Sequence, residues 1–359
     1  MKVLLLGEFS ALHKNLKEGL CKIGVDVTHA SNGDGWKKIN SDITWISSSQ
    51  SILGWVRTFF SLLFLLPRLR GYDVVQLMSP VLFPRQFGVN KLIINYIIKN
   101  NKKVFLVGAG ASDMNSYIAD FFEKKFKYPQ LYNAILEGRS CLWSQTEEGR
   151  CYNEWLHSRL HGYIPIMYEY AQGYRDVNYN KLLKTIPIPM NLDKVAYSKN
   201  IVGDKVVIFH GLIREEQKGT PLITQALKEI KDLYPNDVEI IIDGRMPLDV
   251  YLETLGRANI VIDQVYSASN GVNAVYNLAM GNVVLGGGDI ESLSEYGLKK
   301  SESPLISIEA NSDDIKNKLI DLIENKDTLP DLGWKSRKYA EKLHCYETVA
   351  KSYVSEWSK

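Results

Sequence analysis

The stretch 205-KVVIFHGLIREEQKGTPLITQALKEIKDL-233 passes from a β-branched run, through a loop of glycine and mixed charges, into an amphipathic run. The first part is typical of a buried strand, and the apolar spacing of the last part predicts a helix. Gly211 allows the backbone to turn closely after the strand. This order of strand, glycine-containing turn and helix predicts one βα unit of a parallel sheet.

The same alternation continues on both sides of this unit. Strand-like runs such as KVLLLG, YDVVQLMS, KKVFLVGAG and NVVLGGG alternate with longer amphipathic runs, and 359 residues suit two domains of ~150 residues each. We therefore predict an α/β fold of two doubly wound Rossmann-like domains that face a cleft. The predicted ranges are 1–195 and 196–334, followed by a C-terminal helix over 335–359 that packs back toward the first domain.

Composition narrows the class of protein. Apolar residues make up 45% and charged residues 23%, which excludes a largely disordered chain, and the formal net charge of +2 gives no general reason to expect nucleic acid. The four cysteines are scattered without C-x-x-C spacing, as is usual for reduced thiols in the cytosol. The N-terminal run predicts a first strand rather than a signal peptide. We expect a cytoplasmic protein.

The loop 210-HGLIREEQKGT-220 has the features of an anion site. A helix that begins near Thr220 has unpaired amides at its start, and Arg214 and Lys218 supply a planar fork and a point charge beside them. These groups match a diphosphate better than one carboxylate. The alternative is a solvated loop, because REEQK contains both signs of charge and can pair internally.

A second loop has the same character. In 259-NIVIDQVYSASNGVNAVYNLAMGNVVLGGG-288 a strand ends at Asp263 and Gln264, and a helix begins near Gly271 after a polar loop. Its N-terminus should face the same crevice, because ligands bind beyond the carboxyl ends of parallel strands. Gly281 ends the helix, and the three glycines 286–288 form a turn after the next strand.

These two motifs together resemble the donor domain of retaining glycosyltransferases of the GT-B architecture, family 4. HGLIREEQKGT is similar to that family's glycine, arginine and lysine-glycine motif, and GVNAVYNLAMGNVV to its Gly-x-x-x-x-Glu-Ala-x-Ala-x-Gly-x-Pro-Val segment. The opening GEFSALHKNLKEGLCKIGVDVTHASNGDGWKK resembles bacterial members that synthesise surface polysaccharides. The resemblance covers nearly the whole chain.

The resemblance implies a nucleotide-sugar as donor, with Arg214 and Lys218 neutralising its diphosphate in a catalytic role. It implies transfer with retention of configuration and no need for a metal or cofactor. The donor-binding residues it implies are His210, Gly211, Arg214, Lys218, Asn270, Gly271, Val272, Asn273 and Tyr276.

One departure concerns two acidic residues. The family has two glutamates near the donor sugar and the ribose, and alignment to Gly281 places them on Ser269 and Tyr276. Tyr276 can bind or stack on a ribose in place of the acid, or it can belong to the core.

The resemblance assigns the turn after the first strand to the acceptor, with Glu8, Phe9, Ser10 and His13 as contacts. It also assigns the loop 108-GAGASD-113, in which Asp113 would be catalytic by taking or orienting the proton of the acceptor hydroxyl. The alternative for Asp113 is to cap the next helix.

The segment 51-SILGWVRTFFSLLFLLPRLR-70 is basic and aromatic, and its apolar stretch from Thr58 to Leu66 is too short to span a bilayer. It predicts peripheral contact with an anionic membrane surface. The residues expected at that surface are Arg57, Phe59, Phe60, Arg68 and Arg70. A core helix, or a lid over the cleft, is the alternative.

These observations favour a glycosyltransferase that moves a sugar to a lipid-linked or oligosaccharide acceptor in capsule or O-antigen synthesis. A nucleotide-sugar epimerase of the same architecture is one alternative, and a non-catalytic sugar- or lipid-binding subunit is another. An NAD-dependent oxidoreductase is disfavoured, because GAGASD lacks the third glycine of the dinucleotide motif and the first turn reads GEFSAL.

Overall fold

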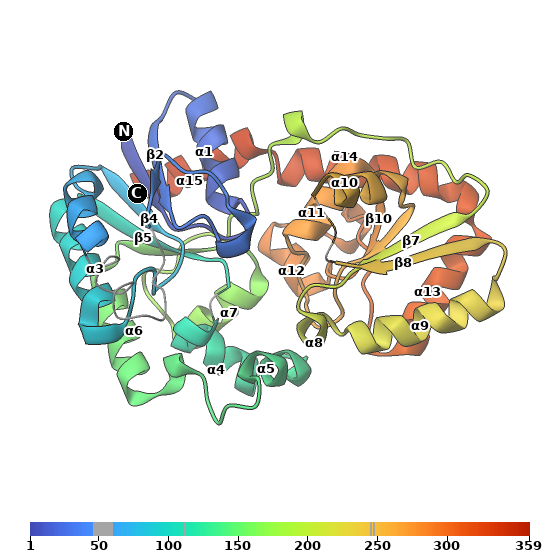
Figure 1. The fold of residues 1–359 in the computed structure, drawn as a ribbon, viewed down its shortest axis with the longest axis horizontal. Coiled ribbons are helices and arrows are strands. Elements are labelled where there is room, and N and C mark those ends of the chain that lie inside the picture. Colours follow the sequence, from blue (N-terminus) through green and yellow to red (C-terminus); the bar gives the residue numbers. More distant parts are fainter. Residues whose placement is uncertain (46–59, 111, 245, 247) are drawn as a thin grey trace. The chain divides into compact units, whose positions relative to one another are not determined.

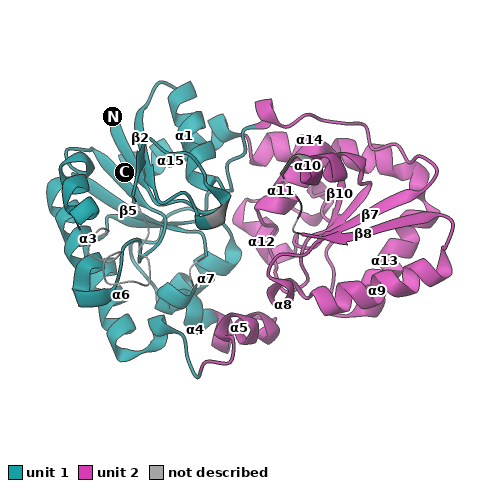
Figure 2. Cartoon of the chain, viewed as in Figure 1, with its two compact units in different colours: residues 1–121, 140–191, 346–359 teal, residues 122–139, 192–345 magenta. Residues whose placement is uncertain are grey.

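A computed structural model describes residues 1–45, 60–110, 112–244, 246 and 248–359 (Figure 1). The chain divides into two compact units, which Figure 2 shows in different colours. Unit 1 contains residues 1–121, 140–191 and 346–359, and unit 2 contains residues 122–139 and 192–345. Each unit is built on its own parallel sheet, which confirms the predicted α/β class.

Unit 1 has a six-stranded sheet of order β3-β2-β1-β4-β5-β6, and all its pairings are parallel. The strands are β1 (Lys2–Leu6), β2 (Asp26–Ser31), β3 (Ile43–Thr44), β4 (Val74–Leu77), β5 (Lys103–Gly108) and β6 (Gly162–Pro165). The helices are α1 (Leu12–Lys22), α3 (Val89–Asn100), α6 (Glu147–Arg159), α7 (Tyr168–Asp176) and α15 (Tyr346–Ser358), and α4 (Ser116–Lys124) crosses from unit 1 into unit 2.

Both faces of the unit 1 sheet are covered. Val3 and Leu5 of β1 join a core with Leu16 of α1 and Tyr353 of α15. The alternate residue Leu4 is as fully buried, so the opposite face is covered as well. This two-sided burial explains why the strands are continuous apolar runs.

Unit 2 has a four-stranded parallel sheet of order β10-β9-β7-β8. The strands are β7 (Val206–Gly211), β8 (Val238–Asp243), β9 (Ile260–Ile262) and β10 (Val283–Leu285). The helices are α5 (Pro129–Leu136), α8 (Glu215–Lys218), α9 (Thr220–Leu233), α10 (Leu248–Arg257), α11 (Val272–Met280), α12 (Ile290–Glu295), α13 (Ser312–Glu324) and α14 (Leu329–Leu343).

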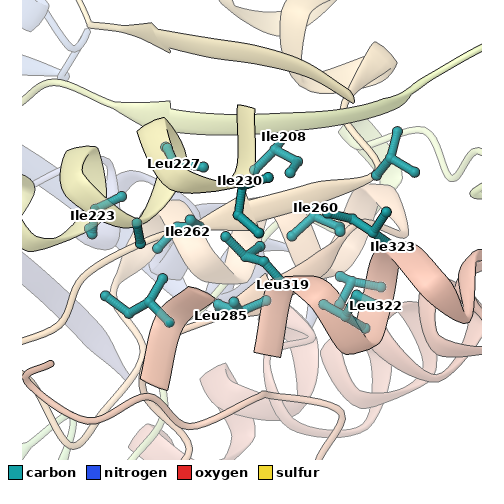
Figure 3. Close-up of a cluster of buried hydrophobic side chains, with 14 of the residues drawn as sticks. Ile208, Ile223, Leu227, Ile230, Ile260, Ile262, Leu285, Leu319, Leu322 and Ile323 are labelled. Atoms are coloured by element: carbon teal, nitrogen blue, oxygen red, sulfur yellow. The ribbon is translucent and has the colours of Figure 1, made fainter. Parts of the chain in front are cut away.

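The unit 2 sheet also separates two apolar layers. Ile208 and Ile262 pack with α9 and α13 in the main cluster, where Figure 3 shows Ile223 and Leu319 among the residues beside the sheet. On the other face the adjacent residue Phe209 packs in a smaller cluster. Apolar side chains therefore pack against both faces of the sheet.

The single helix predicted over 335–359 is wrong. The chain forms two helices there, α14 and α15, with a break at His344 and Cys345. The backbone N–H of Tyr346 donates to the carbonyl of Met190 at 3.1 Å instead of continuing the helix. This bond fixes the start of α15, which then packs on α1 in unit 1.

Residues 122–139 also differ from the prediction. The predicted first domain is continuous over 1–195, whereas residues 122–139 group with unit 2. Aromatic contacts hold the segment there, since the rings of Tyr128 and Tyr266 lie 6.1 Å apart. Periodicity reports local structure and carries no signal for such a contact.

Gly19 provides a test of the α1–α15 packing. A Cβ at Gly19 would lie 2.3 Å from the carbonyl oxygen of Tyr346, so the helices approach too closely for any side chain. Gly19→Ala should destabilise the protein by ~1–3 kcal/mol, although alanine is normally the better helix former. The control is Gly203→Ala, where no atom lies within 4 Å. Equal urea midpoints for the two variants would contradict the close packing.

Candidate functional site

The candidate site lies at the carboxyl edge of the unit 2 sheet. β7 and β9 pair there in parallel, with His210 opposite Ile262. β8, which follows β7 in the chain, pairs on the other side of β7, so the strand order reverses between β7 and β9. In open α/β sheets, ligands bind at such a reversal. The turns after β7 and β9 are therefore placed to contact one ligand.

The turn after β7 follows the prediction closely. One helical turn, α8, separates the strand from α9, which begins at Thr220. Gly219 has φ of 74°, and a Cβ there would lie 3.0 Å from Val265 Cβ, so both conformation and space require glycine. Arg214 adopts φ of 57° with an exposed side chain. A non-glycine residue in this strained region is a feature that gathers at ligand sites.

Lys218 is held beside a buried carboxylate. Its Nζ lies 3.5 Å from the carbonyl oxygen of Gly211 and 3.5 Å from Oδ1 of Asp263. These distances are long for hydrogen bonds, so the ammonium keeps capacity for a further anionic partner. The Lys218 side chain is 15% exposed and that of Asp263 3%. The sequence did not assign Asp263 to the site, although its position at a strand end was a signal.

Asp263 is in turn held by the start of α11. Its Oδ1 accepts a hydrogen bond from Nδ2 of Asn273 at 3.1 Å. Tyr251 donates its hydroxyl proton to Oδ1 of the same Asn273. Lys218, Asp263 and Asn273 therefore form one connected group across the ends of β7 and β9, in which predicted residues from both loops meet.

Two helices begin at this edge without a side-chain cap. The N-cap residues of α9 and α11 are Gly219 and Gly271, and neither offers a side chain to the first-turn amides. Val272 and Asn273 are the first residues of α11. Unpaired amides at a helix start bind anions well, because they are donors with positive dipole character. At α9, Pro221 has no N–H and the amide of Leu222 donates to the carbonyl of Gly219 at 3.1 Å, so the start of α11 is the better source of amide donors.

His210 is fully buried and engaged at both ring nitrogens. Nδ1 lies 2.8 Å from the carbonyl oxygen of Ile262, and Nε2 lies 2.9 Å from Oγ1 of Thr220. A carbonyl only accepts, so Nδ1 carries the proton and Nε2 accepts from the threonine hydroxyl. Burial lowers the pKa of His210 to about 4. His210 thus links β9 to the start of α9, and its predicted contact with the donor would need one of these bonds to open.

The glycine run after β10 packs against the loop between β9 and α11. A Cβ at Gly286 would lie 2.4 Å from the carbonyl oxygen of Gln264, and one at Gly287 would lie 2.7 Å from the amide nitrogen of Asn270. Asn270 is buried beneath this turn. Asp289, directly after the run, forms an ion pair with Lys127 of segment 122–139, which the sequence did not anticipate.

Neither position aligned with the family glutamates offers an acid to a ligand. Ser269 is buried, and its carbonyl accepts hydrogen bonds from Ser267 Oγ and Gln264 Nε2. The ring of Tyr276 is half-buried and packs against the smaller apolar cluster of unit 2. This packing favours the core alternative for Tyr276, and its contact with a ribose stays a prediction.

The predicted acceptor residues lie in unit 1, at the start of α1. Glu8 is buried, and its carboxylate accepts from the amides of His13 at 3.2 Å and Lys14 at 2.9 Å. Burial raises the pKa of Glu8 to about 7. His13 is also buried, with Nδ1 2.8 Å from Gly7 O and Nε2 3.2 Å from Gln76 Nε2. Both side chains therefore organise the turn from within.

Phe9 and Ser10 are the more accessible part of that turn, each half-buried. Ser10 Oγ accepts from Lys37 Nζ at 2.8 Å. In the other predicted acceptor loop, Asp113 is half-buried in a single turn of 3₁₀ helix, and Ala111 lies outside the described residues. Asn115, not Asp113, caps α4 by accepting from the amide of Ile118 at 3.3 Å. The catalytic role of Asp113 stays a prediction.

A separate cavity of about 500 Å³ lies at the opposite, amino-terminal edge of the unit 2 sheet. Lys205, Glu239, Arg257 and Asn259 line it. Arg257 is paired with Glu239 at 2.8 Å. No helix start is among its lining residues, in contrast to the carboxyl edge of the same sheet.

Comparison with solved structures shows the class of fold. The chain is similar to HepE from Anabaena in complex with UDP-glucose, with a TM-score of 0.63, 13% identity, and 100% of this chain and 99% of that chain covered. It is similar to sucrose-phosphate synthase from Thermosynechococcus elongatus, with a TM-score of 0.62, 14% identity, and 100% and 98% covered. The fold is that of GT-B glycosyltransferases.

The chain is also similar to a solved structure of an enzyme with a different activity. UDP-GlcNAc 2-epimerase from Neisseria meningitidis, bound to UDP-GlcNAc, matches with a TM-score of 0.53, 12% identity, and 99% of each chain covered. No family model and no curated protein matches the sequence. Identities this low show the fold and leave the reaction to be argued from the site.

The buried, neutral state of His210 predicts a pH dependence of stability. Because its pKa is about 4 in the folded protein and about 6.5 when unfolded, its contribution is complete above pH 6.5 and is lost as the pH falls through 4. Between these limits the wild type should lose ~3 kcal/mol more unfolding free energy than His210→Gln, which has no titrating ring. Urea unfolding at several pH values measures this, and parallel pH profiles would show that His210 is not held neutral.

Proposed function

We propose that the protein is a glycosyltransferase that takes a sugar from a nucleotide-sugar donor. One observation carries this proposal: the uncapped start of α11 and Lys218 lie on either side of Asp263 at the carboxyl edge of a Rossmann-like sheet within a GT-B fold. This arrangement supplies amide donors and a cation to a diphosphate, which is the group common to nucleotide-sugars. Arg214, exposed at the same turn, adds a planar fork.

We further propose transfer with retention of configuration and without a metal. The diphosphate would leave on the face from which the acceptor hydroxyl attacks, and the charge that grows on it would be stabilised by Lys218, Arg214 and the helix amides. Asp113 would orient the acceptor hydroxyl or take its proton. Activity that survives a metal chelator would agree with this chemistry.

The acceptor is proposed to be lipid-linked, as in capsule or O-antigen synthesis. The support is the segment 51–70, of which residues 60–70 are described. Leu62, Leu65 and Leu69 are buried, whereas Phe60 and Phe64 are 54% and 81% exposed. Exposed aromatics beside Arg68 and Arg70 suit the interface of an anionic membrane. No described helix is long and apolar enough to cross a bilayer.

An epimerase is the second candidate, because UDP-GlcNAc 2-epimerases share the fold. An epimerase would convert a nucleotide-sugar without any acceptor. Incubation of the protein with a panel of nucleotide-sugars, with and without lipid-linked acceptors, separates the two. Product that forms only with acceptor supports the transferase, and product without acceptor supports the epimerase. No turnover in either case would favour a non-catalytic subunit.

Removal of either cation should slow turnover. We expect Arg214→Ala and Lys218→Ala each to reduce kcat/KM by roughly a hundredfold, equivalent to ~3 kcal/mol, because their contacts strengthen as the diphosphate leaves. Arg214→Lys should also be poor, since a point charge cannot replace a two-pronged contact.

Steady-state kinetics measure these losses, with the exposed Lys228→Ala as the matched control. The loss should be the same for every acceptor tested. If both variants stay within ~0.5 kcal/mol of the wild type, the loop is a solvated surface and the diphosphate assignment fails.

Binding to liposomes tests the proposed contact with the membrane. The triple change of Arg57, Arg68 and Arg70 to glutamate should sharply reduce binding to anionic liposomes, since each basic residue contributes ~1 kcal/mol near such a surface. The control carries the same charge change at exposed lysines elsewhere, namely Lys228, Lys335 and Lys351. Liposome sedimentation that does not distinguish the two triple variants would remove the membrane proposal.

A further inference from the structure

The site lacks an acid where the family pattern has one, yet it contains a carboxylate in another place. Ser269 and Tyr276 occupy the two aligned positions. Asp263, six residues before Ser269, ends β9 at the same edge of the sheet. Its backbone N–H donates to the carbonyl of Leu285 at 2.9 Å, which fixes the backbone of Asp263 at the end of the sheet.

The two oxygens of the Asp263 carboxylate differ in their hydrogen-bond contacts. Oδ1 receives Asn273 Nδ2 at 3.1 Å and faces Lys218 Nζ at 3.5 Å. Oδ2 is buried and has no hydrogen-bond partner among the residues that the structure describes. A buried acceptor without a partner is unfavourable, and such atoms in native proteins usually have a functional or solvent partner.

Gly271 lies directly beside the unpartnered oxygen. A Cβ at Gly271 would lie 3.7 Å from Asp263 Oδ2 and 3.9 Å from Gln264 Nε2, with no closer neighbour. The backbone of Gly271 has φ of −85° and ψ of −179°, an extended conformation that any residue adopts. Conformation therefore does not require glycine here, whereas the missing side chain leaves space between Oδ2 and the start of α11.

The chemistry of Oδ2 limits what can bind it. A carboxylate oxygen only accepts, so its partner must be a donor, and the diphosphate of a nucleotide-sugar, esterified at both ends, has no proton to give at neutral pH. A sugar hydroxyl does donate. The terminal torsion of aspartate is soft, so a rotation of the carboxylate can bring Oδ2 toward a ligand.

Resting on the proposed function, we propose that Asp263 binds a sugar hydroxyl of the nucleotide-sugar and so replaces the acids absent at Ser269 and Tyr276. Lys218 and the start of α11 hold the phosphates, and Asp263 recognises the hydroxyl beside them. The hydroxyl belongs either to the transferred sugar or to the ribose, which carry the same chemistry.

Calorimetric titration of Asp263→Asn tests this assignment with three ligands: a nucleotide-sugar that binds the wild type, its nucleoside diphosphate, and inorganic pyrophosphate. We expect ~10- to 100-fold weaker binding of the nucleotide-sugar, the usual effect of losing a hydrogen bond to a charged group. Pyrophosphate should bind as well as before or better, because Lys218 is no longer partly neutralised. The control is the exposed Asp232→Asn, which should change nothing.

The nucleoside diphosphate distinguishes the two hydroxyl sources. If it keeps its affinity, the hydroxyl is on the transferred sugar, and if it weakens with the nucleotide-sugar, the hydroxyl is on the ribose. Equal weakening of all three ligands, or no change in any, overturns the role of Asp263. If the wild type binds no member of a nucleotide-sugar panel, the proposed function itself fails.

Gly271→Ala gives an independent test without touching the charge. The methyl group fits, since its neighbours stand at ordinary contact distance, and it would lie over Oδ2. We expect a folded protein with the same loss of nucleotide-sugar affinity and with pyrophosphate binding retained. Unchanged nucleotide-sugar binding in Gly271→Ala would show that no ligand approaches Oδ2 from this side.

Discussion

The parallel pairing of β7 with β9 places the two candidate ligand-binding turns of unit 2 side by side. Their register places the turn after His210 beside the turn after Ile262. The first turn contains Lys218, and the second leads into α11, which begins without a side-chain cap. Apolar layers on both faces of the sheet hold the two strand ends in place. If the register slipped by one residue, Ile208 and Phe209 would exchange faces and the two helix starts would separate.

The residues at this edge of the sheet differ in burial and in charge. His210 is kept neutral by burial, so it stabilises the joint between β9 and α9 without adding charge. Lys218 supplies positive charge, and its long contact to Asp263 leaves it capable of meeting an anion. Under the proposed function, the amides and the cation would bind phosphate and the carboxylate would bind a hydroxyl, and a nucleotide-sugar carries both of these groups.

Local features of the site were predictable from the sequence because they depend on near neighbours. Gly211, Gly219 and the start of α9 at Thr220 follow from periodicity and turn chemistry within a few residues. Contacts between distant segments were not predictable. The bond from Tyr346 to Met190 breaks the terminal helix, and the pair of Lys127 with Asp289 joins residues far apart in the chain. The periodicity of a single sequence indicates which face of a helix or strand is buried. It does not indicate which other element packs on that face.

A crystal structure of the protein with a nucleoside diphosphate is the most direct test of the proposed site. We expect phosphate oxygens within ~3 Å of the backbone nitrogens at the start of α11 and of Lys218 Nζ. A diphosphate in the cavity of about 500 Å³ at the opposite edge, beside Lys205 and Arg257, would contradict the assignment of the site.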